Sequence, residues 1–347
     1  MLYIHQHTCI SPQQTFVDVD IESLKESVDN KLKAFEPAYE GIPHGILRRM
    51  GKAVRMGVGA AIPILKNNAA IDGIIIGTAN GGMEDCIKFL NQIIDYEEGL
   101  LAPGNFVQST PNAIAAQVGL MTKNKSYNIT HVHRGLAFET ALIDAAMIIK
   151  ENPGKSYLLG AVDEISTYNF NIDYLDGWYK KEIVSNKDLY GSQTPASIAG
   201  EGTAMFLVND KKEGASAVVK AIKTLHTGDE ETVKTELKSF IENNFEKEQK
   251  PGLFLTGENG DNRLLKYYSA CESVLPHINT IRYKHMSGEY PTTSSFALWL
   301  CCHILGCHQI PAHMNKKAKK PEKIKNIILY NNYKGMQHVF AIVGNCE

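Results

Sequence analysis

Residues 127–149 read YNITHVHRGLAFETALIDAAMII, a segment whose hydrophobic period changes part of the way along. Alternation and β-branched residues over 127–133 predict a short strand. The largely apolar residues from Gly135 onward predict a buried helix. A strand that turns abruptly into a helix often carries an enzyme's nucleophile, because the unpaired N–H groups of the helix N-terminus favour an anion. At this turn the chain has His133 rather than serine or cysteine.

The size and composition of the chain limit the classes of protein it can represent. With 347 residues it is long enough for two domains or for one large layered domain. The hydrophobic fraction of 44% and charged fraction of 21% are ordinary for a globular protein. A net charge of −2 gives no global field that would attract nucleic acid. We interpret the basic run 316–320 as a solvated loop, with an acidic protein partner as the alternative.

Targeting signals and cysteine usage indicate a cytoplasmic location. The first residues lack the basic start and unbroken apolar core of a signal peptide. No apolar run approaches the roughly 20 residues that a membrane span requires. The seven cysteines have no regular spacing, which favours reduced thiols over a disulfide framework. We therefore expect a cytoplasmic protein with no membrane span.

A group of cysteines and histidines near the C-terminus suggests a metal site. These residues are Cys301, Cys302, His303, Cys307, His308 and His313. Their spacing matches no familiar zinc pattern, and most of them lie in an apolar segment typical of a helix from Ser294 onward. Because free cysteine is commonly a small buried hydrophobe, we expect no metal and no other cofactor.

The order of predicted elements indicates a layered α/β fold. Buried strands at 71–77 and 155–164 alternate with helices at 44–66 and 111–120. The irregular aromatic stretch at about 165–195 predicts a loop or cap. Later strands and helices repeat the α/β character of the first part. We predict one unit over 1–347 with a duplicated, five-layered α-β-α-β-α architecture, divided into an N-terminal half (1–198) and a C-terminal half (199–347).

Six segments, in order, resemble motifs of the β-ketoacyl-acyl-carrier-protein synthases, which have the thiolase fold. They are GTANGGMED (77–85), TPNAIAAQVGL (110–120), YLLGAVDEIS (157–166), AGEGTAMFLV (199–208), KHMSGEYPTTSSFAL (284–298) and LYNNYKGMQHVFAIV (329–343). Each segment alone is a weak signal, since Gly-rich turns are common. Their shared order makes the chain similar to this family along most of its length.

The resemblance implies that the catalytic residues have been replaced. Such a synthase carries the acyl chain on a cysteine thiolate, and two histidines help decarboxylate the malonyl unit and stabilise the enolate. The cysteine position falls on His133, the first histidine position on Thr256 and the second on Glu289. The family's lysine is retained as Lys284. A shift of a residue or two in the alignment would give a role to His131 instead.

The residues around the turn have alternative interpretations. We expect His133 to be a buried histidine that plugs the pocket, with assistance to malonyl decarboxylation as the alternative. Arg134 is expected to form a structural ion pair with Glu139 or with a partner's carboxylate, or else to narrow the acyl tunnel. Glu201 is expected to be a structural anchor.

The resemblance also implies partners. Thiolase-fold synthases are dimers, and some polyketide systems pair a catalytic subunit with a chain-length factor that lacks the nucleophile. We predict such a non-catalytic subunit of fatty-acid, polyketide or polyene biosynthesis, similar to the partners in aryl-polyene and flexirubin-type pathways. Its partners would be a catalytic ketosynthase subunit, or a second copy, and acyl-carrier protein. The residues expected at the tunnel and interface are Phe106, Val107, Thr110, Pro111, Asn112 and Arg134, with an oxyanion-like loop at Tyr333 and Gly335.

Two other functions remain open at this point. One is a homodimeric acyltransferase or malonyl decarboxylase with a rebuilt site, in which Cys86 or Cys271 would have to act as nucleophile. The other is a scaffold that binds carrier protein and takes no part in forming a tunnel.

Overall fold

A computed structural model describes residues 1–66, 71–245, 251–317 and 324–346. The strands are β1 (Leu2–Ile10), β2 (Lys31–Leu32), β3 (Gly73–Thr78), β4 (Tyr127–Val132), β5 (Tyr157–Asp163), β6 (Ala199–Gly200), β7 (Gly202–Asn209), β8 (Ala217–His226), β9 (Leu253–Thr256), β10 (Asn279–Arg282), β11 (Asn315–Lys317), β12 (Asn326–Tyr333) and β13 (Gln337–Gly344). The α-helices are α1 (His44–Leu47), α2 (Lys52–Lys66), α3 (Met83–Asp95), α4 (Pro103–Gln108), α5 (Ala113–Thr122), α6 (Ala137–Glu151), α7 (Thr167–Leu175), α8 (Glu230–Asn244), α9 (Leu265–Val274), α10 (Lys284–Ser287) and α11 (Ser294–Cys307). Short 3₁₀ helices are η1 (Asn186–Gly191), η2 (Asn262–Leu264) and η3 (Ala312–Met314).

The main sheet is built from two copies of one topology. Its order is β11-β10-β9-β12-β13-β8-β1-β7-β5-β3-β4. In the first copy β7 is antiparallel to β1 and β5, and β5, β3 and β4 run parallel. In the second copy β13 is antiparallel to β8 and β12, and β12, β9 and β10 run parallel. Antiparallel pairing of β1 with β8 joins the copies. The predicted duplication is confirmed.

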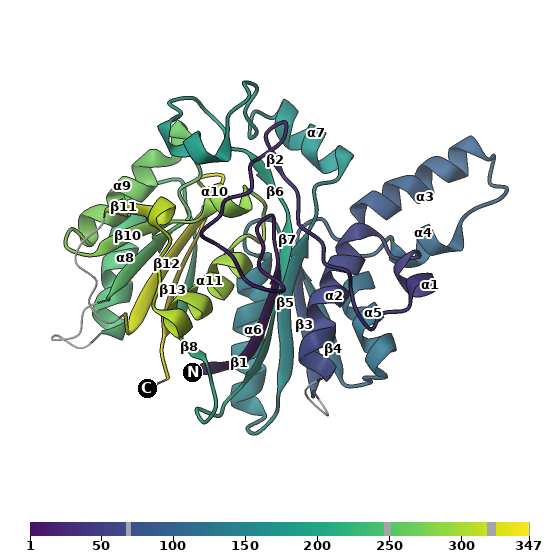
Figure 1. Ribbon diagram of the computed structural model, residues 1–347, viewed down its shortest axis with the longest axis horizontal. Coiled ribbons are helices and arrows are strands. Elements are labelled where there is room, and N and C mark those ends of the chain that lie inside the picture. The colour runs from purple at the N-terminus through teal and green to yellow at the C-terminus, as the bar shows by residue number, and fades with distance from the viewer. Residues whose placement is uncertain (67–70, 246–250, 318–323, 347) are drawn as a thin grey trace.

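Three apolar clusters define the layers (Figure 1). The central cluster combines α6 and α11 with strands from both copies, for example Phe138 and Trp299 with Leu159 and Leu329. A second cluster packs α2 and α5 on the outer face of the first copy. A third packs α8 and α9 on the outer face of the second. The order helix, sheet, helix, sheet, helix is the predicted five-layered architecture.

Burial explains why the strand sequences are apolar. Every residue of β3 is buried, because helices cover both faces of the sheet at this point. Within it, a Cβ at Gly77 would collide with the backbone of Ala137. Glycine thus lets the first turn of α6 lie directly on β3, and this contact fixes the position of the turn that precedes the helix.

Two predicted segments differ in detail from the structure. The helix predicted over 44–66 is divided into α1 and α2, and at the break the Gly51 N–H donates to Gln108 Oε1 at 2.6 Å. The cap at 165–195 contains α7, whose N-terminus is capped by Ser166 Oγ, which accepts from the Asn169 N–H at 3.2 Å. The division into halves at residue 198 remains a proposal, and β7, which follows it, pairs with β1 and β5.

The first copy ends in an open sheet edge and a protruding arm. Strand β4 is the last strand of the sheet, and its residues are exposed or half-buried. Beside it, α3 and α4 extend away from the body (Figure 1). The large apolar side chains exposed on this arm are Met83, Leu90, Ile94, Tyr96, Leu100, Phe106 and Val107. The first copy therefore presents an extensive apolar surface to its surroundings.

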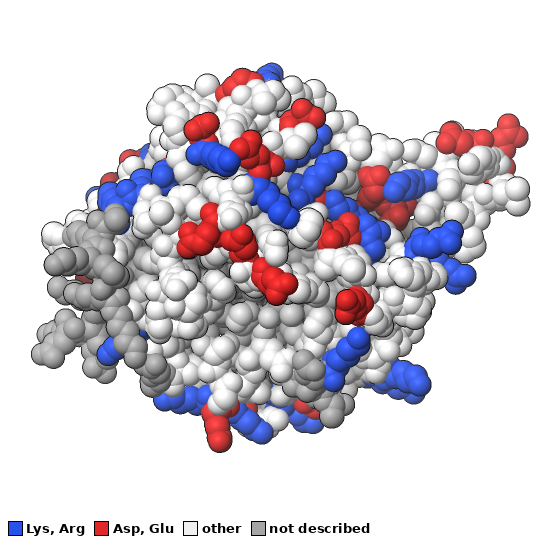
Figure 2. Space-filling model, in the orientation of Figure 1, with Lys and Arg blue, Asp and Glu red and all other residues white. Residues whose placement is uncertain are grey.

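Charges on the face shown in Figure 2 are mixed in sign, with lysine and arginine interspersed among aspartate and glutamate. This distribution agrees with the small net charge, and the face shown presents no broad basic surface for nucleic acid. Among the described residues, no helix combines the length and apolarity needed to cross a membrane.

Candidate functional site

The turn between β4 and α6 lies at the open edge of the sheet. The side chain of His133 is exposed, and its backbone N–H donates to the Thr78 carbonyl at 3.3 Å. The expectation of a buried histidine that plugs a pocket is therefore wrong for the chain on its own. The expected ion pair between Arg134 and Glu139 is also wrong. Arg134 Nη1 instead lies 3.4 Å from Asn80 Oδ1, while Glu139 faces the interior.

The side chain of Tyr333 covers the start of α6. It packs against Gly135 so closely that a Cβ at this position would overlap the tyrosine. The Gly135 N–H donates to Gln337 Oε1 at 2.8 Å. The Gly335 N–H, in a turn with φ of 70°, donates to Asn332 Oδ1 at 2.8 Å. Both amides that border this turn thus have acceptors within the chain, so neither is free to bind an oxyanion.

A buried ion pair includes Glu289, the residue expected at the position of the second family histidine. Lys284, which is fully buried, donates from Nζ to Glu289 Oε2 at 2.7 Å. The same oxygen accepts from Asn259 Nδ2 at 2.7 Å. Burial lowers the pKa of Lys284, and the neighbouring Glu289 carboxylate opposes this effect. The lysine charge is neutralised inside the chain and is not available to a substrate.

Glu139 is a further member of this centre that the sequence analysis considered only as a partner of Arg134. It lies in the first turn of α6 and is 1% exposed. Neither of its carboxylate oxygens has a hydrogen-bond partner among the described residues. Burial raises the pKa of Glu139 to about 7, against the opposing effects of the nearby Ser294 hydroxyl and Lys284 ammonium. The sequence signal was an acid in the first turn of a largely apolar helix.

Thr256 is the residue expected at the position of the first family histidine. Thr256, at the end of β9, is fully buried, and its Oγ1 has no hydrogen-bond partner within the described residues. Glu258, two residues later, forms ion pairs with Arg282 and Lys316. Neither side chain supplies the neutral imidazole donor that stabilises an enolate.

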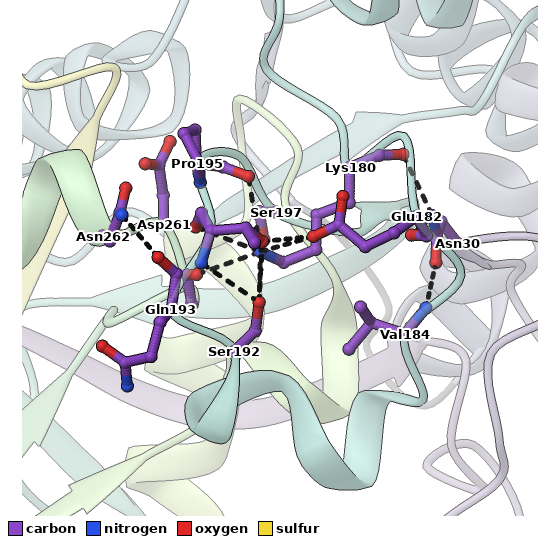
Figure 3. Close-up of polar contacts among 12 residues, drawn as sticks. Asn30, Lys180, Glu182, Val184, Ser192, Gln193, Pro195, Ser197, Asp261 and Asn262 are labelled. Atoms are coloured by element: carbon purple, nitrogen blue, oxygen red, sulfur yellow. Dashed lines mark hydrogen bonds and ion pairs between the residues drawn. The ribbon is translucent and has the colours of Figure 1, made fainter.

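A buried lysine of the cap holds the neighbouring turn in place (Figure 3). Lys180 Nζ donates to Ser192 Oγ and Thr194 Oγ1, both at 2.9 Å. It also lies 3.3 Å from the carbonyl of Gly260. That turn carries Asn259, whose side chain binds Glu289. The cap is thereby connected to the ion pair at the centre.

The residues expected at a tunnel or interface lie on the surface of the first copy. Phe106 and Val107 are 61% and 68% exposed. The Phe106 ring lies 5.2 Å from that of Phe89. Asn112 Oδ1 accepts from Thr130 Oγ1 of β4 at 3.0 Å. Thr110 is exposed and Pro111 half-buried. The arm, α5 and β4 thus form one surface. The buried Lys284–Glu289 pair is not part of it.

Other candidate residues have structural roles. Glu201 is fully buried, forms an ion pair with Lys52 and accepts from two backbone N–H groups, as expected of an anchor. Lys316 and Lys317 pair with Glu272, so the start of the basic run is not a free solvated loop. Residues 318–320 of that run lie outside the described residues. Cys301 and Cys302 are buried in α11, and the described residues contain no cluster of three or more potential metal ligands.

The thiols considered as substitute nucleophiles are poorly placed. Cys271 is buried in α9, and burial raises the pKa of its thiol. Cys86 is half-buried on α3, a different helix from the one that follows β4. The described residues therefore show a centre with a self-neutralised lysine, a tyrosine over the turn and no activated thiol.

Comparison with known proteins bears on the fold. Residues 25–172 match the family model described as the N-terminal domain of β-ketoacyl synthases. No curated protein matches the chain.

Solved structures share the fold over nearly the whole chain, at low identity. A β-ketoacyl synthase from Burkholderia phymatum superposes with a TM-score of 0.78 at 12% identity, covering 99% of both chains. A ketosynthase in complex with its chain length factor from Xenorhabdus doucetiae gives 0.77 at 12% identity, covering 99% of this chain and 98% of the other. The ishigamide ketosynthase/chain length factor gives 0.76 at 12% identity, with the same coverage.

Proposed function

We propose that this chain, which has the thiolase-like fold of the β-ketoacyl synthases, is the non-catalytic subunit of a ketosynthase heterodimer. In this role it resembles a chain-length factor: it shapes the acyl tunnel of a catalytic partner and does not carry an acyl group itself. The complex would accept substrates from acyl-carrier protein in fatty-acid, polyketide or polyene biosynthesis.

The observation that carries this proposal is the buried pair of Lys284 and Glu289. A ketosynthase must stabilise a developing negative charge on the enolate oxygen. In this region the chain has a carboxylate, Glu289, bound to Lys284. Glu139 adds a second buried carboxyl group to the same region. With the charge of Lys284 neutralised by Glu289, this region offers no free positive charge to stabilise a malonyl carboxylate or an enolate, which also argues against malonyl decarboxylation.

The surface of the first copy supports a dimeric partner. Strand β4 is a sheet edge with unpaired backbone groups, a feature that proteins normally cover. The exposed apolar side chains of the arm lie beside it. A second thiolase-like chain that pairs with β4 would cover both features together.

The alternative is a homodimeric acyltransferase with a rebuilt site. It requires a reactive thiol, yet Cys271 is buried with a raised pKa and Cys86 lies on the arm. We therefore favour the non-catalytic role.

The decisive experiment is co-expression with candidate ketosynthase subunits, followed by mass determination of the purified complex. A 1:1 heterodimer is expected, in which acyl-carrier protein transfers an acyl group to the partner only. A stoichiometric acyl adduct on this chain, seen by intact-mass spectrometry, would show that it is catalytic.

A further inference from the structure

A cavity of about 430 Å³ lies between α2, β1 and the loops that precede α1. Its lining is mostly apolar and includes Phe16, Pro37 and Ile62. Among the described residues, Glu40 and Lys66 are its only charged members, and their charges are opposite in sign. The volume is within the range of sites for small molecules. A lining of this kind favours an apolar, uncharged ligand.

One polar group of the cavity wall lacks its regular partner. Pro63 lies inside α2 and lines the cavity together with Gly59, one turn earlier. Because proline has no N–H, the Gly59 carbonyl has no donor at the position where a regular helical carbonyl finds one. The carbonyl of a helical residue points along the helix axis toward the residue four positions later, which here is Pro63. The freed oxygen therefore lies on the turn of α2 that borders the cavity.

Two other polar groups of the lining have neighbours of their own. Thr8 Oγ1, on β1, donates to the Ala60 carbonyl at 2.6 Å. The Lys66 ammonium lies against Gly41, which does not line the cavity, and a Cβ at that glycine would overlap it. Neither donor therefore serves the Gly59 carbonyl, and this acceptor is left to a ligand.

Tyr39 forms a second wall of the cavity and is held in a strained conformation. Its φ of 51° is unusual for a bulky residue. The ring packs on Gly59, where a Cβ would overlap it, and the hydroxyl donates to Glu36 Oε2 at 2.6 Å. Arg55 holds the same carboxylate through Nε and Nη2, at 2.6 and 2.8 Å. Strained residues held by several contacts are common at ligand sites, and these contacts fix the wall in position.

We propose that this cavity binds a small apolar molecule with one N–H or O–H donor, which bonds to the Gly59 carbonyl. The apolar lining supplies most of the binding free energy, and the carbonyl selects a ligand that carries a donor. An anion is disfavoured, because a carbonyl oxygen only accepts hydrogen bonds. Neither the Lys284–Glu289 pair nor the arm lines the cavity, so the site does not depend on the proposed role in a heterodimer.

The test compares indole with indene, two fused-ring molecules of nearly the same shape. Indole has one N–H donor and no strong acceptor, whereas indene has a CH₂ group in place of the N–H. Dissociation constants for both are measured with the full chain by ligand-observed NMR. Indole is expected to bind with a dissociation constant on the order of 10⁻³ M or tighter.

Pro63→Ala separates the hydrogen bond from the rest of the cavity. It restores an N–H at position 63, to which the Gly59 carbonyl then bonds, and it raises the helix propensity of α2, so the variant should fold. The preference for indole, expressed as the dissociation constant of indene divided by that of indole, should fall about threefold to tenfold in this variant. An unchanged ratio would show that the carbonyl does not bind the ligand and would overturn the proposal.

A second variant tests whether the ligand lies in this cavity. Ala38→Trp fills the cavity from an exposed position of its lining and should abolish binding of both molecules. Ala146→Trp, at an exposed position on α6, is the matched control and should bind indole like the unmodified chain. Failure of indole to bind at about 10 mM, or unchanged binding in Ala38→Trp, would also contradict the proposal.

Discussion

Lys284 and Glu289 are joined by a 2.7 Å ion pair in the interior of the chain, five residues apart on the two sides of a tight turn. Gly288, between them, has φ of 70° and packs on the backbone of Ala199, where a Cβ would collide. The turn thus fixes the carboxylate beside the ammonium. The pair as a whole carries no net charge, so Lys284 offers no free positive charge to a bound group.

The first prediction concerns the stability of this pair. Lys284→Met should lower the free energy of unfolding by about 3–5 kcal/mol, because it leaves a buried carboxylate without its cation. Lys284→Met combined with Glu289→Leu should be clearly more stable than the single variant, since no charge is left buried. Urea unfolding of both variants measures the difference. Equal losses in the two would show that the pair does not act as a unit.

The second prediction concerns pH. The pKa of Glu139 is about 7 in the folded chain, above the ordinary value of 4.5, so the folded state binds the proton more tightly than the unfolded state. Its contribution to stability is present below pH 4.5 and is lost as the pH rises towards 7, by about 3 kcal/mol in total. Glu139→Gln should remove this loss. The measurement is urea unfolding at pH 5 and pH 8, comparing the change in each protein. An identical pH dependence in both would contradict the assignment.

The fold was predictable because several strands of the two copies, such as β3, β5 and β9, are buried apolar runs. The positions of Lys284 and Glu289 followed from their spacing within one segment. The environment of His133 was not predictable, because exposure depends on β4 being the last strand of the sheet, which is a property of the whole topology. Glu139 was assigned the wrong partner, Arg134, and Tyr333 was assigned no contact. Their actual neighbours come from distant segments of the chain.

The third prediction concerns the turn between β4 and α6. His133→Cys should not produce a condensing enzyme, either alone or with a partner whose own cysteine has been removed. A thiol at this position would lack donors for the enolate, because Thr256 and Glu289 stand where the family histidines are expected, and Tyr333 covers the start of α6. The assay is condensation of acyl and malonyl units on carrier protein. Measurable condensation by the variant would refute the account of the centre.

The fourth prediction concerns the sheet edge. A charge at Val132, which is 55% exposed in the single chain, should disrupt a dimer in which β4 pairs with a partner strand. Such an interface is expected to bury more than about 2,000 Å² in total. Val132→Glu should therefore sediment as a monomer at micromolar concentration, with little change in the unfolding of the single chain. Met147→Glu, a substitution at a similarly exposed position on α6, is the matched control. A monomer before any substitution, with every co-expressed ketosynthase, would count against the interface.

The last prediction concerns the length of the product. If the arm reaches the tunnel of the partner, Phe106→Ala opens space on the order of a few methylene groups, and the complex should make longer chains at a somewhat reduced rate. Because Phe106 is 61% exposed, the free energy of unfolding of the single chain should fall by about 1 kcal/mol or less, well below the 3–5 kcal/mol typical of a buried phenylalanine. His133→Ala should leave the product profile nearly unchanged. The measurement is product length from the reconstituted heterodimer. If His133→Ala abolishes turnover while Phe106→Ala changes nothing, the histidine takes part in the chemistry, and the non-catalytic role is wrong.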